Sequence, residues 1–160
     1  MVRFIVYFFI IIILLEIIIR DIKEKIILNK SNLALLFLGI ILGFLEGDLQ
    51  ERILGAALYT LPFILIYGYG SDILNKECMG MGDVKLITSL GFLLKFNKVF
   101  DILIFLNISF IIPLIYLGGK YIYFKKLDKD IAFGPFLILS YIVIVIKEKL
   151  WKIVEKEERI

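Results

Sequence analysis

VRFIVYFFIIIILLEIII, residues 2–19, is the stretch that decides how this chain folds. Only Arg3 and Glu16 interrupt its apolar and aromatic side chains. As a helix it would extend about 27 Å, close to the roughly 30 Å hydrocarbon core of a bilayer. The run is longer than the apolar core of a signal peptide, and no small-residue cleavage site follows it. We therefore interpret it as a first transmembrane helix.

The remaining sequence continues in the same way. Hydrophobic residues make up 61% of the 160 residues, whereas soluble domains contain roughly 45–50%. Six apolar segments emerge, at residues 2–19, 33–45, 53–69, 84–96, 99–117 and 131–146. They predict an all-α fold, a polytopic membrane protein built as a bundle of six transmembrane helices. We expect a single membrane-embedded domain over residues 1–160.

Residues 147–160 form a polar, amphipathic C-terminal tail. Drawn as a helix, it places apolar side chains on one side, namely Leu150, Trp151, Ile153 and Val154. Such a segment can lie in the plane of the membrane interface. It can equally extend the sixth helix, and the sequence favours neither interpretation.

Basic residues predict the orientation, because short loops rich in Lys and Arg stay in the cytoplasm. Loops one, three and five carry most of the basic residues between the spans: Arg20, Lys23, Lys25, Lys30, Lys76, Lys85, Lys120, Lys125, Lys126 and Lys129. Loops two and four hold only Arg52, Lys95 and Lys98. The basic residues of the tail point the other way. We give the internal loops more weight, so the odd-numbered loops are predicted to face the cytoplasm.

Composition excludes several kinds of chemistry. The chain has no histidine and a single cysteine, Cys78, which rules out an intrachain disulfide and a zinc site built from His or Cys. No basic stripe interleaved with aromatic residues indicates nucleic-acid binding. Proton transfer is therefore left to carboxylates, Lys or Tyr, and we expect neither a metal nor a cofactor.

Two aspartates lie at the ends of predicted spans. Asp21 follows the first span and Asp83 precedes the fourth, so six spans place both on the same side of the membrane. Two carboxylates that come close cannot both ionise cheaply, so one pKa rises and the pair shares a proton near neutral pH. The ionised member can activate water while the protonated member donates to a peptide carbonyl, as in aspartic proteases.

The residues around Asp83 fit this chemistry. Gly80 and Gly82 would allow close approach of a substrate backbone and dihedral angles closed to other residues. The short segments 33–45 and 84–96 each follow an aspartate loop and would leave a wet recess there. Simpler interpretations remain open: Asp83 as a helix N-cap and the first-loop aspartate as a solvated charge. Lys85 either anchors the loop in the cytoplasm or tunes Asp83.

Other polar and small residues within the spans have structural interpretations. Glu16 and Arg20 are four residues apart and are expected to form an ion pair along one helix. Gly39 and Gly43 form a GxxxG pattern, which is typical of close helix packing.

Three motifs resemble those of a known family, the type IV prepilin peptidases, which are intramembrane aspartic proteases. GMGDVKL, residues 80–86, resembles the GxGD signature of that family. IAFGPFL, residues 131–137, resembles its final-helix motif. Asp21, followed eight positions later by Asn29, is similar to its first aspartate motif with the downstream Ile-Pro-Asn. The resemblance covers about residue 5 to residue 146.

The resemblance implies an aspartic endopeptidase of the cell membrane, active at the cytoplasmic face, whose partners are lipid and the leader peptides of prepilins or pseudopilins. The site residues that it implies are the catalytic pair Asp21 and Asp83, an active-site loop with Gly80, Gly82 and Lys85, and Asn29 as support for the first motif.

The chain departs from the family pattern at two places. Leu28 stands where the family usually has proline before the asparagine. Larger members carry paired CxxC motifs ahead of the first span and also methylate the new N-terminus, whereas Cys78 is the one cysteine of this sequence. The sequence therefore resembles the short, peptidase-only form.

Two other functions are compatible with acidic groups in membrane helices. A small polytopic transporter would also use membrane carboxylates, but those groups should lie near the middle of the bilayer rather than at the ends of spans. A presenilin-type protease that cuts within helices usually has its first aspartate after a tyrosine, whereas Arg20 precedes Asp21. The positions of the two aspartates favour the prepilin peptidase.

Overall fold

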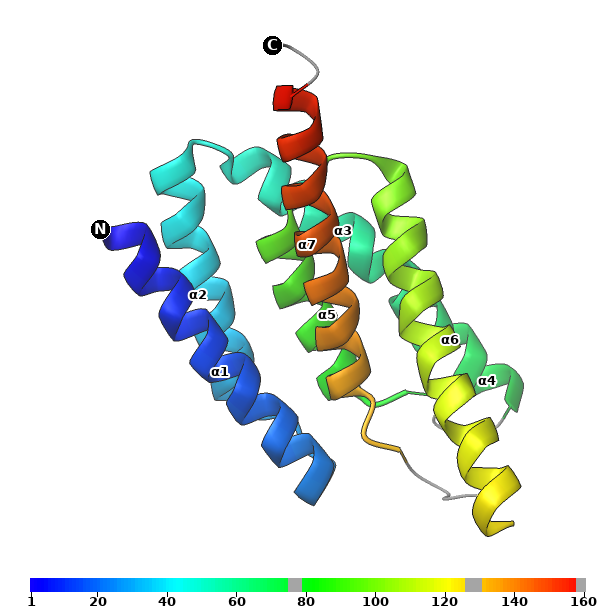
Figure 1. Ribbon diagram of the computed structural model, residues 1–160. Coiled ribbons are helices and arrows are strands. Elements are labelled where there is room, and N and C mark those ends of the chain that lie inside the picture. Colours follow the sequence, from blue (N-terminus) through cyan, green and yellow to red (C-terminus); the bar gives the residue numbers. More distant parts are fainter. Residues whose placement is uncertain (75–78, 126–130, 158–160) are drawn as a thin grey trace.

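A computed structural model describes residues 1–74, 79–125 and 131–157. Long helices dominate these ranges (Figure 1): α1 (Val2–Glu24), α2 (Asn29–Glu46), α3 (Leu49–Leu65), α5 (Met81–Leu94), α6 (Val99–Phe124) and α7 (Gly134–Glu157). A π-helix (Ile66–Gly70) and the short α4 (Ser71–Leu74) extend α3. No strand occurs in the described part of the chain. The predicted all-α fold is confirmed.

Four helical stretches are long and apolar enough to cross a membrane: α1, α2, α3 with its π-helical extension, and α6. Large hydrophobic side chains cover the outside of the bundle, for example Phe4 at 82% and Phe44 at 72% exposed. Lipid is the solvent that suits such a surface, and the protein is a multi-pass membrane protein. The remaining two predicted spans correspond to α5 and α7, so the count of six spans stays a prediction.

The boundaries of several predicted spans were wrong. The second helix, α2, is not short: it begins at Asn29 and has 18 residues, because Ser31 and Asn32 in its first turns are buried inside the bundle despite being polar. A wet recess can therefore arise only from α5, whose 14 residues extend about 21 Å. The last helix, α7, runs without a break into the tail as far as Glu157. Of the two interpretations of the tail, the described residues show the helical extension.

Successive long helices run in opposite directions (Figure 1). The C-terminal ends of α1 and α6 therefore share one end of the bundle with the N-terminal ends of α2, α5 and α7. We call this the aspartate end, because it holds Asp21 and Asp83. We call the opposite end the arginine end, because Arg52 lies there at the start of α3.

The core is centred on α5, which packs against α2, α3 and α7. Its crossing with α3 is so close that an added Cβ on Gly55 would lie 2.4 Å from the carbonyl oxygen of Gly91. Glycine is therefore required at this crossing, as in other membrane helix pairs. Gly39 packs in the same way on Phe92, where an added Cβ would lie 2.7 Å from the ring. The predicted packing role of Gly39 is confirmed.

Candidate active site

Asp21 lies in the last turn of α1 and is only 4% exposed, so it is not the solvated loop charge of the simpler interpretation. Its Oδ2 accepts a hydrogen bond of 2.8 Å from the backbone N–H of Gly134, the first residue of α7. The first N–H groups of a helix have no partner within the helix and carry the positive end of its dipole. The start of α7 therefore provides a donor and a favourable field for a carboxylate.

Glycine is what allows this contact. A Cβ added to Gly134 would lie 2.8 Å from Oδ2 of Asp21, closer than real Cβ contacts. Any other residue at this position would push the carboxylate away from the backbone N–H. The contact joins positions 113 residues apart in the sequence.

Asp83 is the third residue of α5 and is half-buried. It is not the N-cap, which is Gly80, so that interpretation of the sequence was wrong. A backbone hydrogen bond from Gly80 reaches its side chain, the arrangement found in one half of a capping box. Burial, followed by the charge of Asp21, raises the pKa of Asp83 to about 7 in spite of this hydrogen bond.

One side chain contacts both the start of α5, which carries Asp83, and the start of α7, which binds Asp21. The Cβ of Ile27, in the loop after α1, lies 3.4 Å from the position of a Cβ on Gly82 in α5. The Cδ1 of the same Ile27 lies 3.3 Å from the position of a Cβ on Gly134 in α7. The N-termini of α5 and α7 are thus brought against the end of α1. Within the described ranges, no Lys or Arg forms an ion pair with Asp21 or Asp83.

Lys85 and Asn29 contact each other rather than the aspartates. The Nζ of Lys85 donates a hydrogen bond of 2.9 Å to Oδ1 of Asn29. One turn further along the same two helices, the Oγ of Ser89 donates to the carbonyl oxygen of Asn32 at 3.2 Å. Together these contacts set the register of α2 against α5. Lys85 and Asn29 therefore hold α2 against α5, the helix that carries Asp83, and their contact does not involve either carboxylate.

Residues 8–118 match the model of the type IV leader peptidase family. The chain belongs to the type IV leader peptidase family. The match contains both aspartates and most of the bundle.

Two curated relatives are similar to this chain over most of its length, and both are prepilin leader peptidase/N-methyltransferases. One, from Pectobacterium carotovorum subsp. carotovorum, is 29% identical over 133 residues, which cover 79% of this chain and 46% of the relative. The other, from Xanthomonas campestris pv. campestris, is 27% identical over 124 residues, or 75% of this chain and 42% of the relative. The chain thus spans about half the length of these leader peptidases. No solved structure matches it.

Sequence reasoning assigned no role to Gly134 or Ile27. Gly134 lies beyond the stretch matched to the leader peptidase family, but it is the glycine of the IAFGPFL motif, which was the available signal. Ile27 stands between Asp21 and Asn29, inside the first motif. Both residues matter through contacts between helices, which a local pattern does not describe.

Of the two roles predicted for the glycines of the GMGD motif, the unusual backbone conformation is wrong for Gly80, while the close approach of a substrate stays a prediction. Gly80 has φ −73° and ψ 142°, which any residue can adopt, so no special backbone conformation is used there. The missing side chain is what counts, because a Cβ on Gly80 would lie 3.2 Å from Oδ2 of Asp83. Gly82 likewise leaves room for Ile27. Cys78 lies outside the described residues.

Proposed function

We propose that this protein is an intramembrane aspartic endopeptidase that cleaves the leader peptides of type IV prepilins or pseudopilins at the cytoplasmic face of the cell membrane. One observation carries the proposal: Asp21 accepts a hydrogen bond from Gly134, and Ile27 packs against both Gly134 and Gly82, the neighbour of Asp83. Two aspartates that are 62 positions apart in the sequence are thus brought to one site. The family match supports peptide cleavage, and the names of the two relatives support a prepilin substrate.

The pair supplies a complete proton cycle. Near neutral pH, Asp83 is protonated in a large share of the molecules, because burial and the charge of Asp21 raise its pKa to about 7. Asp21 takes a proton from water while the water oxygen attacks the peptide carbonyl, and Asp83 donates its proton to the carbonyl oxygen. When the C–N bond breaks, Asp21 passes its proton to the leaving amine and the new hydroxyl returns one to Asp83. Both carboxyl groups then regain their starting states.

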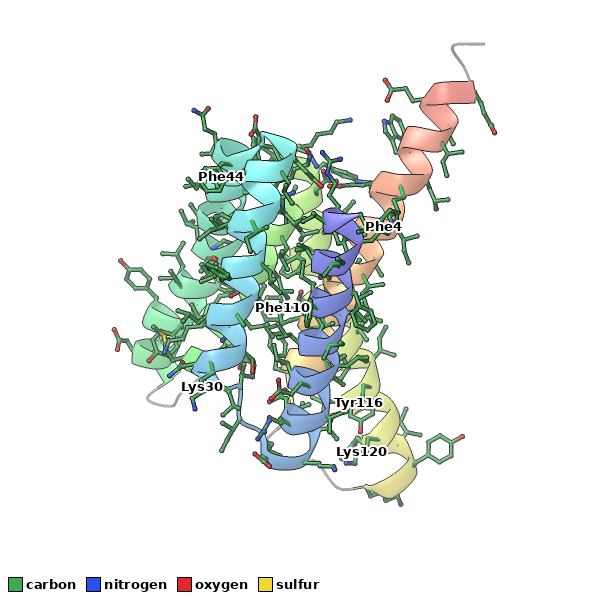
Figure 2. All side chains as sticks on the ribbon, turned by 90° about the vertical axis from the view of Figure 1, so that its left-hand side faces the viewer. Phe4, Lys30, Phe44, Phe110, Tyr116 and Lys120 are labelled. Carbon is green, nitrogen blue, oxygen red and sulfur yellow. The ribbon has the colours of Figure 1, made fainter. Side chains whose placement is uncertain are left out.

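The basic residues of the loops between the helices support a cytoplasmic site, whereas those at the C-terminal end of α7 lie at the opposite end of the bundle (Figure 1). Lys30 and Lys120 lie toward the aspartate end of the bundle (Figure 2). At the arginine end, Arg52 and Lys95 are engaged by acidic side chains inside the protein. Short loops that are rich in basic residues stay in the cytoplasm, so the aspartate end is assigned to that side.

The test is cleavage of a co-expressed prepilin by aspartate variants. Asp21→Asn and Asp83→Asn should each lower the cleavage rate by about a thousandfold or more, because either change removes one of the two proton carriers. Asp72→Asn is the matched control, since Asp72 is an exposed aspartate in α4 with the same chemical change. Membrane insertion of each variant is checked by fractionation. Normal processing by either active-site variant would refute the proposal.

A further inference from the structure

A cavity of about 570 Å³ lies between α1 and α7, away from the aspartates themselves. On α1 it is lined by residues that recur every three or four positions, including Phe4, Tyr7, Ile11, Leu14 and Ile18. This spacing keeps them on one face of a helix, and the next position on the same face is that of the first aspartate. The cavity-lining stripe of α1 therefore leads directly to the proposed active site.

The wall on α7 converges on the same point. Its lining residues include Ile138, Ile142 and Val145, which also recur every three or four positions. Continued one turn toward the N-terminus of α7, this stripe reaches Gly134, whose N–H binds Asp21. The lining stripes of α1 and α7 thus both lead to the hydrogen bond between Asp21 and Gly134, and from there they run side by side along the bundle.

The cavity is long and apolar over most of its course. From Ile18 to Phe4 the helical rise is about 21 Å, most of the way across a hydrocarbon core. A helix of that length, about 11 Å wide with its side chains, has a volume of roughly 2,000 Å³. The cavity therefore accommodates one face of a helix and leaves the rest against lipid. Its walls are open to this, since Ile11 is 56% and Ile142 is 41% exposed.

The far end of the cavity is polar, and two of its three lining cations, Arg52 and Lys95, are already satisfied, whereas the third, Lys149, is exposed. Arg52 donates to Glu46 at 2.8 Å and to Asp48 at 2.6 Å, and Lys95 donates to Asp48 at 2.9 Å. The hydroxyl of Tyr7 donates to Glu46 as well. These two cations are held by carboxylates of the protein itself, which argues against an anionic lipid headgroup as the intended occupant.

We propose that the α1–α7 cavity is the docking groove for an apolar transmembrane helix of the substrate, continuous with the peptide bond that is cut. This inference rests on the proposed function. A polypeptide that leaves the active site into the bilayer must satisfy its own backbone hydrogen bonds, so it must be helical there. The groove begins one turn from the carboxylate that acts on the substrate, is apolar along its length and has room for one helix face.

Two substrates separate this role from catalysis. One is a membrane-inserted prepilin with its apolar helix, and the other is a short soluble peptide that contains the cleavage site alone. Ile11→Trp and Ile142→Trp fill the groove and should raise KM for the prepilin about tenfold with little change in kcat, the pattern of lost substrate binding. For the short peptide, both groove variants should cleave at least as fast as the control Ile111→Trp. Ile111 is an exposed position on α6 outside the groove.

A photo-crosslinking amino acid at position 142, placed in an Asp83→Asn background to block cleavage, reports the occupant directly. We expect crosslinks to apolar substrate residues spaced three or four apart. Equal loss with both substrates, no loss with either, or crosslinks only to lipid or to a second copy of the chain would overturn the groove assignment. If wild-type enzyme cleaves neither substrate, the proposed function itself fails, and the groove assignment falls with it.

Discussion

The two ends of the bundle treat carboxylates in opposite ways. At the arginine end, Asp48 accepts hydrogen bonds from Arg52 at 2.6 Å and from Lys95 at 2.9 Å. Burial alone would raise the pKa of Asp48, but these two cations outweigh it and the pKa is lowered. At the aspartate end, burial and then the charge of a second carboxylate, Asp21, raise the pKa of Asp83 to about 7.

The difference separates the acids of ion pairs from the pair that we propose to carry the chemistry. Asp101 is paired with Lys147, and Glu16 with Arg20 at 3.0 Å, the ion pair that the sequence predicts. Each of these acids is thus held by a cation of the protein itself. An acid that must exchange protons near pH 7 needs the opposite surroundings, and burial beside a like charge provides them.

The largest effect should come from breaking the network at the arginine end. Arg52→Met leaves Glu46 and Asp48 without their main partner, and the Arg52 side chain is only 3% exposed. Losing one member of a buried ion pair costs about 3–5 kcal/mol of unfolding free energy. Denaturation in detergent measures this loss of stability.

Arg20→Met is the matched control for that prediction. It also removes an arginine from an ion pair, but the Arg20 side chain is 42% exposed. The expected loss is about 0–1 kcal/mol, since exposed pairs contribute little. Equal destabilisation by both changes would show that the two kinds of pair do not differ as described.

Gly134→Ala, at the aspartate end, should lower the cleavage rate strongly and the stability only slightly. The new methyl group would displace the Asp21 carboxylate, which can turn aside at little cost to stability but leaves its place in the pair. Misplacing a catalytic group by about 1 Å can lower the rate about a hundredfold. Gly118→Ala is the control, because nothing lies within 4 Å of a Cβ there. A fully active Gly134→Ala enzyme would contradict the role given to this glycine.

The pH dependence should also distinguish the two ends. Asp83 keeps its proton below its raised pKa of about 7, so cleavage that needs the protonated acid should fall about tenfold per pH unit above that value. For Asp48 the lowered pKa has the opposite sign: its stabilising contribution is present above the unfolded pKa of about 4 and is lost as pH falls further. Initial cleavage rates test the prediction for Asp83, and denaturation in detergent tests the prediction for Asp48. Both are measured from pH 3 to pH 9, a range of about six units that contains both pKa values. Cleavage that keeps rising past pH 8, about one unit above the pKa, would contradict the assignment.

The smallest effect is expected for Lys85→Met. Lys85 is exposed and binds Asn29 at 2.9 Å without contacting either aspartate. Losing an exposed hydrogen bond should cost about 1 kcal/mol or less and change the cleavage rate by no more than about threefold. A loss comparable to that of Asp83→Asn, in the same prepilin assay, would mean that Lys85 acts on the catalytic pair after all.

Hydropathy and spacing alone determine the helical class, the order of the helices and the likeness to prepilin peptidases. Two long helices, α2 and α3, lie between residue 21 and residue 83, and an even number of them is enough to bring the two aspartates to one end of the bundle. This follows from chain order without any side-chain detail. The GxGD pattern and the first aspartate motif are local, and local patterns can be read from one sequence.

Only the tertiary structure decided which groups meet at that end. The start of α2 at Asn29 depends on burying polar residues against α5, the hydrogen bond to Gly134 joins distant positions, and Ile27 matters because it touches two other helices. The groove between α1 and α7 likewise has no signature in either helix alone. The physical reason is that these features are contacts between elements: each is set by how close two helix backbones come, and a single segment of sequence does not carry that distance.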